Sequence, residues 1–136
     1  MIQTIVRDET FLSQVSQDAT QNDLYLAQDL LDTLAAHKDH CVGLAANMIG
    51  HHKRAIIIDL GFMPLVLFNP KIIKKTGIYR TEESCLSLTG SRSTKRYQEI
   101  TVSYLDKQWQ EQTITLKDFP AQICQHELDH LEGILI

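Results

Sequence analysis

The sequence predicts an α+β domain in which a mostly antiparallel β-sheet packs around a C-terminal helix with an HExxH motif, with an amphipathic helix near the N-terminus. Three observations lead to this prediction. An apolar stripe at helical spacing lies in the first third of the chain, short β-branched segments follow from Arg54 onward, and a second helical pattern closes the chain. The order helix, strands, helix is typical of the α+β class.

The first helix is predicted over residues 22–37. Asn22 and Asp23 provide N-cap chemistry at its start. Apolar residues then recur at a helical spacing, which forms one buried stripe. The members of this stripe are Leu24, Ala27, Leu30, Leu31, Leu34 and Ala35.

Four strands and a second helix complete the predicted elements. The strands are expected at residues 55–58, 66–68, 100–104 and 113–116, where β-branched residues are separated by turn residues. The second helix is expected over residues 119–132, with Asp118 as N-cap, Pro120 in the first turn and Gly133 as the stop.

Size and composition indicate a single folded domain over residues 1–136. A length of 136 residues matches the usual domain size. The chain is 43% hydrophobic and 22% charged, values that exclude intrinsic disorder and fibrous repeats. No repeat or Pro/Gly-rich linker divides it.

Charge and hydropathy limit the possible partners. The formal net charge of -4 argues against nucleic acid as the main partner. Apolar runs such as residues 65–68 are far shorter than the roughly 18 residues of a membrane-spanning helix, and the N-terminus lacks a signal-peptide pattern. We therefore expect a cytoplasmic protein that binds neither membranes nor nucleic acid directly.

The second helix carries the HExxH motif as His126, Glu127 and His130. Residues i and i+4 lie on one helical face, so both imidazoles can bind one metal ion, and Glu127 can reach a water beside it. A catalytic site of this type has three protein ligands. Too few residues follow His130 to supply the third, and Ile136 stands where a longer HExxH motif would place another histidine, so the third ligand is expected upstream.

At this point the sequence resembles the peptide deformylase family, which is recognised by three motifs. The family's QHExDHLxG helix is present at residues 125–133 as QHELDHLEG, its EGCLS motif at residues 83–87 as ESCLS, and its GxGxAAxQ motif at residues 41–48 as CVGLAANM. The motif order matches, and the resemblance covers nearly the whole chain.

The resemblance implies a metal-dependent amide hydrolase that removes the N-formyl group from formyl-methionyl peptides, in N-terminal processing during protein biosynthesis. It makes Cys85 the third metal ligand, Glu127 the general base and the Leu86 N–H an oxyanion donor. It implies one divalent metal ion, Fe²⁺ natively with Zn²⁺, Ni²⁺ or Co²⁺ as substitutes, and formylated nascent chains as partners. Expected substrate-binding residues are Val42, Gly43, Phe119, Gln122 and Ile123, the last three because they lie one and two turns before His126 on the same face.

Three residues depart from the family pattern. Ser84 replaces a glycine, which a turn tolerates if its φ is negative. Cys41 replaces the first glycine of the GxGxAAxQ motif. Met48 stands where the family has a glutamine that stabilises the oxyanion, and a thioether cannot donate a hydrogen bond. Asn47, next to Met48, is a possible substitute, although a sequence neighbour generally points elsewhere.

Several alternatives remain open. The sequence is compatible with three proteins: a working deformylase of normal or reduced rate, a paralogue that hydrolyses another formamide or acyl amide, or a non-catalytic metal-binding or peptide-binding homologue. Glu83 is either a surface carboxylate or the partner of Arg96 or Arg92. Cys124 is expected to be a small buried residue and Cys41 a loop residue. The remaining histidines, His37, His40, His51 and His52, are expected on the surface.

Overall fold

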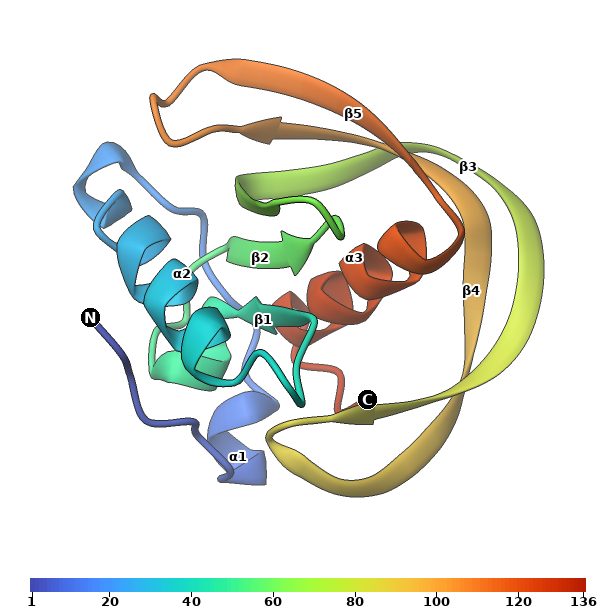
Figure 1. Ribbon diagram of the computed structural model, residues 1–136, viewed down its shortest axis with the longest axis horizontal. Helices are drawn as coiled ribbons and strands as arrows, with labels where there is room; N and C mark the ends of the chain where they lie inside the picture. Colours follow the sequence, from blue (N-terminus) through green and yellow to red (C-terminus); the bar gives the residue numbers. More distant parts are fainter.

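The computed structural model describes residues 1–136, and its main feature is one antiparallel sheet whose strands pair in chain order (Figure 1). The strands are β1 (Gly43–Ala45), β2 (Ala55–Asp59), β3 (Pro64–Cys85), β4 (Leu88–Leu105) and β5 (Glu111–Lys117). The α-helices are α1 (Glu9–Leu12), α2 (Leu26–Ala36) and α3 (Asp118–Leu131), and 3₁₀ segments occupy Gln21–Asp23 and Ala46–Ile49. The predicted α+β class is confirmed.

The long β3–β4 hairpin curves around α3, which lies near the centre of the molecule (Figure 1). The pairing register shifts between Phe68 and Lys71 and again between Ile72 and Lys74. Such bulges bend a strand and increase its twist, which allows one hairpin to follow the side of a helix. The predicted strands at 66–68 and 100–104 lie inside β3 and β4, which extend much further toward the hairpin turn.

The hydrophobic core lies on both sides of β2. Helices α2 and α3 both contact this strand. The four residues from Ala55 to Ile58 are therefore fully buried, because one face of the strand meets each helix. Leu26, Leu30 and Leu34 supply the buried stripe of α2.

Two predicted helix starts are wrong. Residues 22–25 precede α2, and Gln21–Asp23 forms a 3₁₀ turn in which the Asp23 carboxylate accepts a hydrogen bond from the Thr20 N–H. Asp118 is not an N-cap, since Lys117 occupies that position and the φ of Asp118 is 56°. The first difference arises because side chains that cap helices also stabilise turns.

Gly133 ends α3 as predicted, and its environment gives a second reason for glycine. Its φ is +75°, a conformation that favours glycine. A Cβ at this position would lie 2.4 Å from the Ser13 carbonyl oxygen, so only glycine allows the segment after α1 to pass so close.

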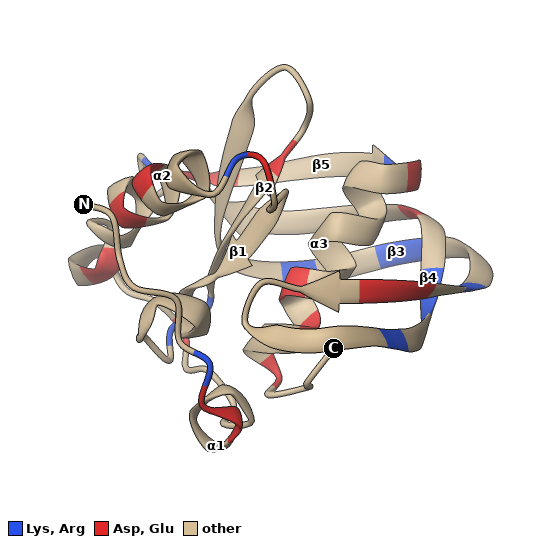
Figure 2. Cartoon of the chain, turned by 60° about the horizontal axis from the view of Figure 1, so that its bottom comes forward, with Lys and Arg blue, Asp and Glu red and all other residues tan.

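Charged side chains are unevenly distributed (Figure 2). The β3–β4 hairpin carries most of the marked Lys and Arg residues, whereas α1 and α2 carry mainly Asp and Glu. None of the helices has the length and apolar composition needed to cross a membrane.

Candidate metal centre

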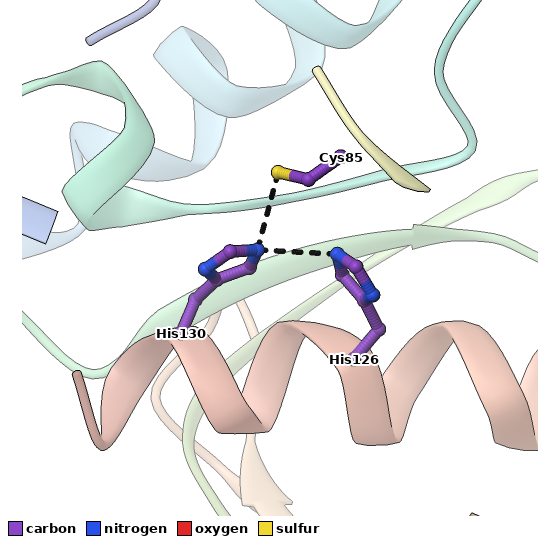
Figure 3. Close-up of side chains that lie close together, drawn as sticks. All are labelled: Cys85, His126 and His130. Carbon is purple, nitrogen blue, oxygen red and sulfur yellow. Dashed lines mark hydrogen bonds between the residues drawn. The ribbon is translucent and has the colours of Figure 1, made fainter. Parts of the chain in front are cut away.

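Two elements bring three ligand side chains together (Figure 3). His126 and His130 extend from the same side of α3, and Cys85 is the last residue of β3. The Nε2 atoms of the two histidines are 3.1 Å apart, and Cys85 Sγ lies 3.3 Å from His130 Nε2. The three ligand atoms lie within 4.8 Å of one another.

Two of the three separations between these atoms are close to those of a tetrahedral metal site, and the third is within 4.8 Å. Bond lengths of about 2.0 Å to nitrogen and 2.3 Å to sulfur place ligand atoms about 3.3–3.6 Å apart around a tetrahedron. His126 Nδ1 lies 2.8 Å from Glu83 Oε1, so in the neutral ring Nδ1 carries the proton and Nε2 offers its lone pair. The Ser87 N–H donates a hydrogen bond to Cys85 Sγ, with 3.4 Å between nitrogen and sulfur. These residues therefore fit one divalent metal ion.

A buried ion-pair network contacts His126 at Nδ1, the ring nitrogen that does not face the other ligand atoms. Arg96 donates two hydrogen bonds to the Glu83 carboxylate, at 2.9 and 2.7 Å, and a third to Asp129 at 2.7 Å. Burial favours the neutral form of Glu83, but hydrogen bonds from His126 and Arg96 outweigh it and lower the pKa of Glu83 to about 2. Of the two alternatives for Glu83, the structure supports pairing, with Arg96 rather than Arg92.

The pKa values of the two histidines are shifted in opposite directions. Burial opposes a positive charge on His126, but interactions with Cys85 and Glu83 raise the pKa of His126 to about 10. Burial and the electrostatic effect of His126 both lower the pKa of His130, which is about 3.

Glu127 lies beside the ligands and is enclosed. Its Oε1 atom has no hydrogen-bond partner on the protein. Burial raises the pKa of Glu127 to about 7. Gly43 of β1 faces it closely, since a Cβ there would lie 2.9 Å from Glu127 Oε2 and 2.7 Å from Ile123 Cγ2. Glycine at position 43 therefore makes room for the carboxylate.

A pocket of about 280 Å³ opens in front of these residues. One of its walls comes from α3 and the end of β3, and the other from the segment that enters β1 and from Met48. The structure brings every residue expected at the site to this pocket except His130, which lies behind it. The expected residues that line it are Cys41, Val42, Gly43, Met48, Cys85, Leu86, Phe119, Gln122, Ile123, His126 and Glu127.

Met48 and Asn47 have different neighbours. Met48 is 1% exposed, and its sulfur lies 3.4 Å from the Ala45 N–H, as a weak acceptor. Asn47 points away from the pocket, with its side-chain amide donating to the His130 carbonyl oxygen at 2.9 Å. The Asn47 amide is therefore not offered to the pocket as the sequence analysis considered, and it stabilises the end of α3 instead.

The Cys85–Ser87 turn presents the backbone expected to meet the substrate. Leu86 lies between β3 and β4, and no hydrogen bond outside the helices and strands uses its N–H as donor. Arg7 donates to the Leu86 carbonyl oxygen at 2.7 Å and so anchors this turn from the N-terminal segment. Ser84 lies in β3 without a positive φ, which satisfies the condition set for replacing glycine.

Sequence reasoning missed several residues around the site. These are Arg7, the Asp129 partner of Arg96, and Gln125, which binds both the N–H and the carbonyl group of Tyr97 in β4. His40, expected to be a surface residue without a role, is exposed and lines the pocket. The motif residues Gln125 and Asp129 were a usable signal, because polar residues facing a sheet from a buried helix require partners.

Comparisons with known proteins extend over almost the whole chain. The family model described as polypeptide deformylase matches residues 2–136. A peptide deformylase of Clostridium beijerinckii is 52% identical over 136 residues, which cover 100% of both chains. The crystal structure of a peptide deformylase from Legionella pneumophila is similar with a TM-score of 0.89 and 31% identity, covering 99% of this chain and 83% of that one.

A second solved structure includes a bound peptide. It is the class I type b peptide deformylase from Acinetobacter baumannii with Met-Ala-Ser bound, similar with a TM-score of 0.87 and 28% identity. The match covers 99% of this chain and 96% of that one.

Proposed function

This chain belongs to the polypeptide deformylase family, and from that premise we propose that it removes the N-formyl group from peptides that begin with formyl-methionine. It is a metal-dependent amide hydrolase. The observation that carries the proposal is the convergence of Cys85, His126 and His130, at a pocket that Cys85, His126 and Glu127 line.

Cys85, His126 and His130 would hold the metal ion. A divalent metal in such a site supplies an acidified water and a Lewis acid for the formyl oxygen. The mixed thiolate and imidazole set suits iron(II) and zinc, and we propose iron(II) as the native ion with zinc, nickel or cobalt as substitutes. Glu83 and Arg96 hold the His126 ring in the orientation that directs Nε2 toward the ion.

Glu127 serves as general base and then as general acid. Its free Oε1 atom accepts a proton from the water that attacks the formyl carbon. The same carboxyl group then donates the proton to the departing amine nitrogen. Gly43 lies against the other carboxylate oxygen, Oε2, and so leaves room for the Glu127 side chain.

The Leu86 N–H donates a hydrogen bond to the oxyanion that forms during the attack. Val42 and Gly43 hold the peptide backbone, and Phe119, Gln122 and Ile123 surround the first side chain. Met48 supplies no second donor. Loss of one oxyanion donor costs roughly 10²–10³-fold in kcat, so we propose an active enzyme slower than relatives with glutamine at this position.

Formylated chains arise during translation, so we propose nascent peptide N-termini as the partners and the cytoplasm as the place of action. A second candidate function is hydrolysis of another formamide or acyl amide. Met48 favours this second candidate, because it stands where the family has a glutamine that donates to the oxyanion. The carbonyl group of a different substrate would take its hydrogen bond from a donor elsewhere in the pocket.

Release of formate from formyl-Met-Ala-Ser by the iron(II)-loaded protein tests the proposed function. We expect turnover by the parent chain and at least a roughly 10²-fold loss in Glu127→Gln, whose amide cannot accept the proton. Glu82→Gln is a matched control, since this exposed glutamate lines the same pocket. Parent-level turnover by Glu127→Gln would refute the mechanism. Turnover of small formamides but not of formyl-Met-Ala-Ser would favour the second candidate.

A further inference from the structure

We propose that Gln122 adapts the first-side-chain pocket to a hydrogen-bond acceptor, so that formyl peptides beginning with methionine sulfoxide are preferred substrates. The proposal rests on the proposed function, because it assumes that the peptide's first side chain lies in this pocket.

Gln122 lies next to the candidate metal ligands on the same face of α3. It precedes His126 by one turn, about 6 Å along the helix axis. Strand β3 faces this side of the helix with alternate residues: Tyr79 contacts Gln122, and Glu83 contacts His126. A side chain of methionine's length that starts near the metal ligands can therefore reach the Gln122 amide.

The hydrogen bond from Tyr79 uses only the oxygen of the Gln122 side-chain amide. The Tyr79 hydroxyl donates to Gln122 Oε1 at 3.3 Å. Gln122 Nε2 has no hydrogen-bond partner on the protein, so its two N–H groups are free donors. The neighbours along this part of the pocket are mainly apolar, with Phe119 and Ile123 from the same helix and Val42 and Leu86 from the facing segments.

An apolar first side chain is a poor match for this donor. A thioether sulfur is only a weak acceptor. When a bound apolar side chain excludes water from the Gln122 donor without giving it a partner, binding is weakened by roughly 5- to 100-fold. Oxidation of methionine to its sulfoxide adds a strong acceptor oxygen to the same sulfur and keeps the length of the side chain. The sulfoxide of the initiating methionine thus satisfies the amide while the rest of the side chain contacts Phe119 and Ile123.

The test compares three formylated tripeptides that differ in the first residue: methionine, norleucine and methionine sulfoxide, the last as two separate epimers. Norleucine is the apolar control of equal length. For the parent protein we expect kcat/KM to be higher for the better sulfoxide epimer than for methionine or norleucine. Gln122→Leu should lower the ratio of sulfoxide to norleucine at least about tenfold, and Gln122→Glu, which keeps the shape but loses the donor, should lower it as well.

Gln108→Leu is the matched control, because Gln108 is an exposed glutamine in the turn between β4 and β5. Its ratio should equal that of the parent. An unchanged ratio in Gln122→Leu, or a parent preference for methionine or norleucine over both sulfoxide epimers, would overturn the proposal.

Binding of the deformylated peptides separates this proposal from the proposed function. Calorimetric Kd values for methionine sulfoxide-Ala-Ser and norleucine-Ala-Ser require no turnover. Tighter binding of the sulfoxide peptide, lost in Gln122→Leu, would support the role of Gln122 even if no formyl peptide were hydrolysed. Equal Kd values in a protein that deformylates would overturn the role of Gln122 alone.

Discussion

The two walls of the pocket depart from the family pattern to different degrees. The wall built from α3 and the end of β3 keeps the motif residues Cys85, His126 and Glu127, with His130 fully buried outside the pocket lining, and it has a serine in place of one glycine. The wall formed by the approach to β1 and by Met48 has a cysteine in place of a glycine and a methionine in place of a glutamine. Both walls face the same space of about 280 Å³.

The difference reflects the kind of group that each wall contributes. The roles proposed for the first wall and for His130 depend on particular side-chain atoms, namely the Cys85 sulfur, the two imidazole nitrogens and the Glu127 carboxylate. The second wall offers mainly backbone, which is insensitive to most substitutions. Gly43 is the exception there, since any side chain would displace Glu127 or Ile123. Met48 is therefore the one change on the second wall expected to alter chemistry directly.

The largest predicted effect is on the first wall. Cys85→Ala removes one of three protein ligands and should weaken metal binding by on the order of 10³-fold, if the three ligands contribute about equally to the total affinity. Metal analysis after dialysis should show one ion per parent chain and almost none in the variant. Cys124→Ala and Cys41→Ala are the controls and should retain the metal. Stoichiometric metal in Cys85→Ala would refute the ligand assignment.

The second prediction concerns Met48→Gln, which restores the family residue at this position of the second wall. Met48→Gln places a neutral donor at the pocket, and it should raise kcat on formyl-Met-Ala-Ser by roughly ten- to a thousand-fold. KM should change little, because the donor acts mainly on the transition state. Steady-state kinetics of the metal-loaded variant measures both constants. No gain, with metal bound and circular dichroism unchanged, would indicate that the donor comes from elsewhere or that the substrate does not need it.

Local sequence patterns predicted the first wall better than its surroundings. His126 and His130 are four residues apart on one helix, so helical geometry alone places them together. The contacts of Glu83 with Arg96 and of Arg7 with Leu86 depend on pairing between distant segments, and no local pattern determines them. The full length of β3 and β4 was missed for a similar reason, because polar residues dominate the part of the hairpin near its turn and only the pairing keeps it extended.

The smallest predicted effect concerns Glu83, which contacts His126 and is not itself a proposed metal ligand. Glu83→Gln keeps an oxygen that can accept from His126 Nδ1 but removes the negative charge, while Asp129 continues to pair with Arg96. Metal affinity should fall by roughly 10- to 100-fold, the range typical of partners behind a ligand histidine. Competition with a chelator measures this change, and Glu82→Gln, on the opposite face of β3, is the matched control. Equal affinities in the two variants would mean that the Glu83 charge does not act on the metal through His126, and that the network only stabilises the packing of β3 against α3.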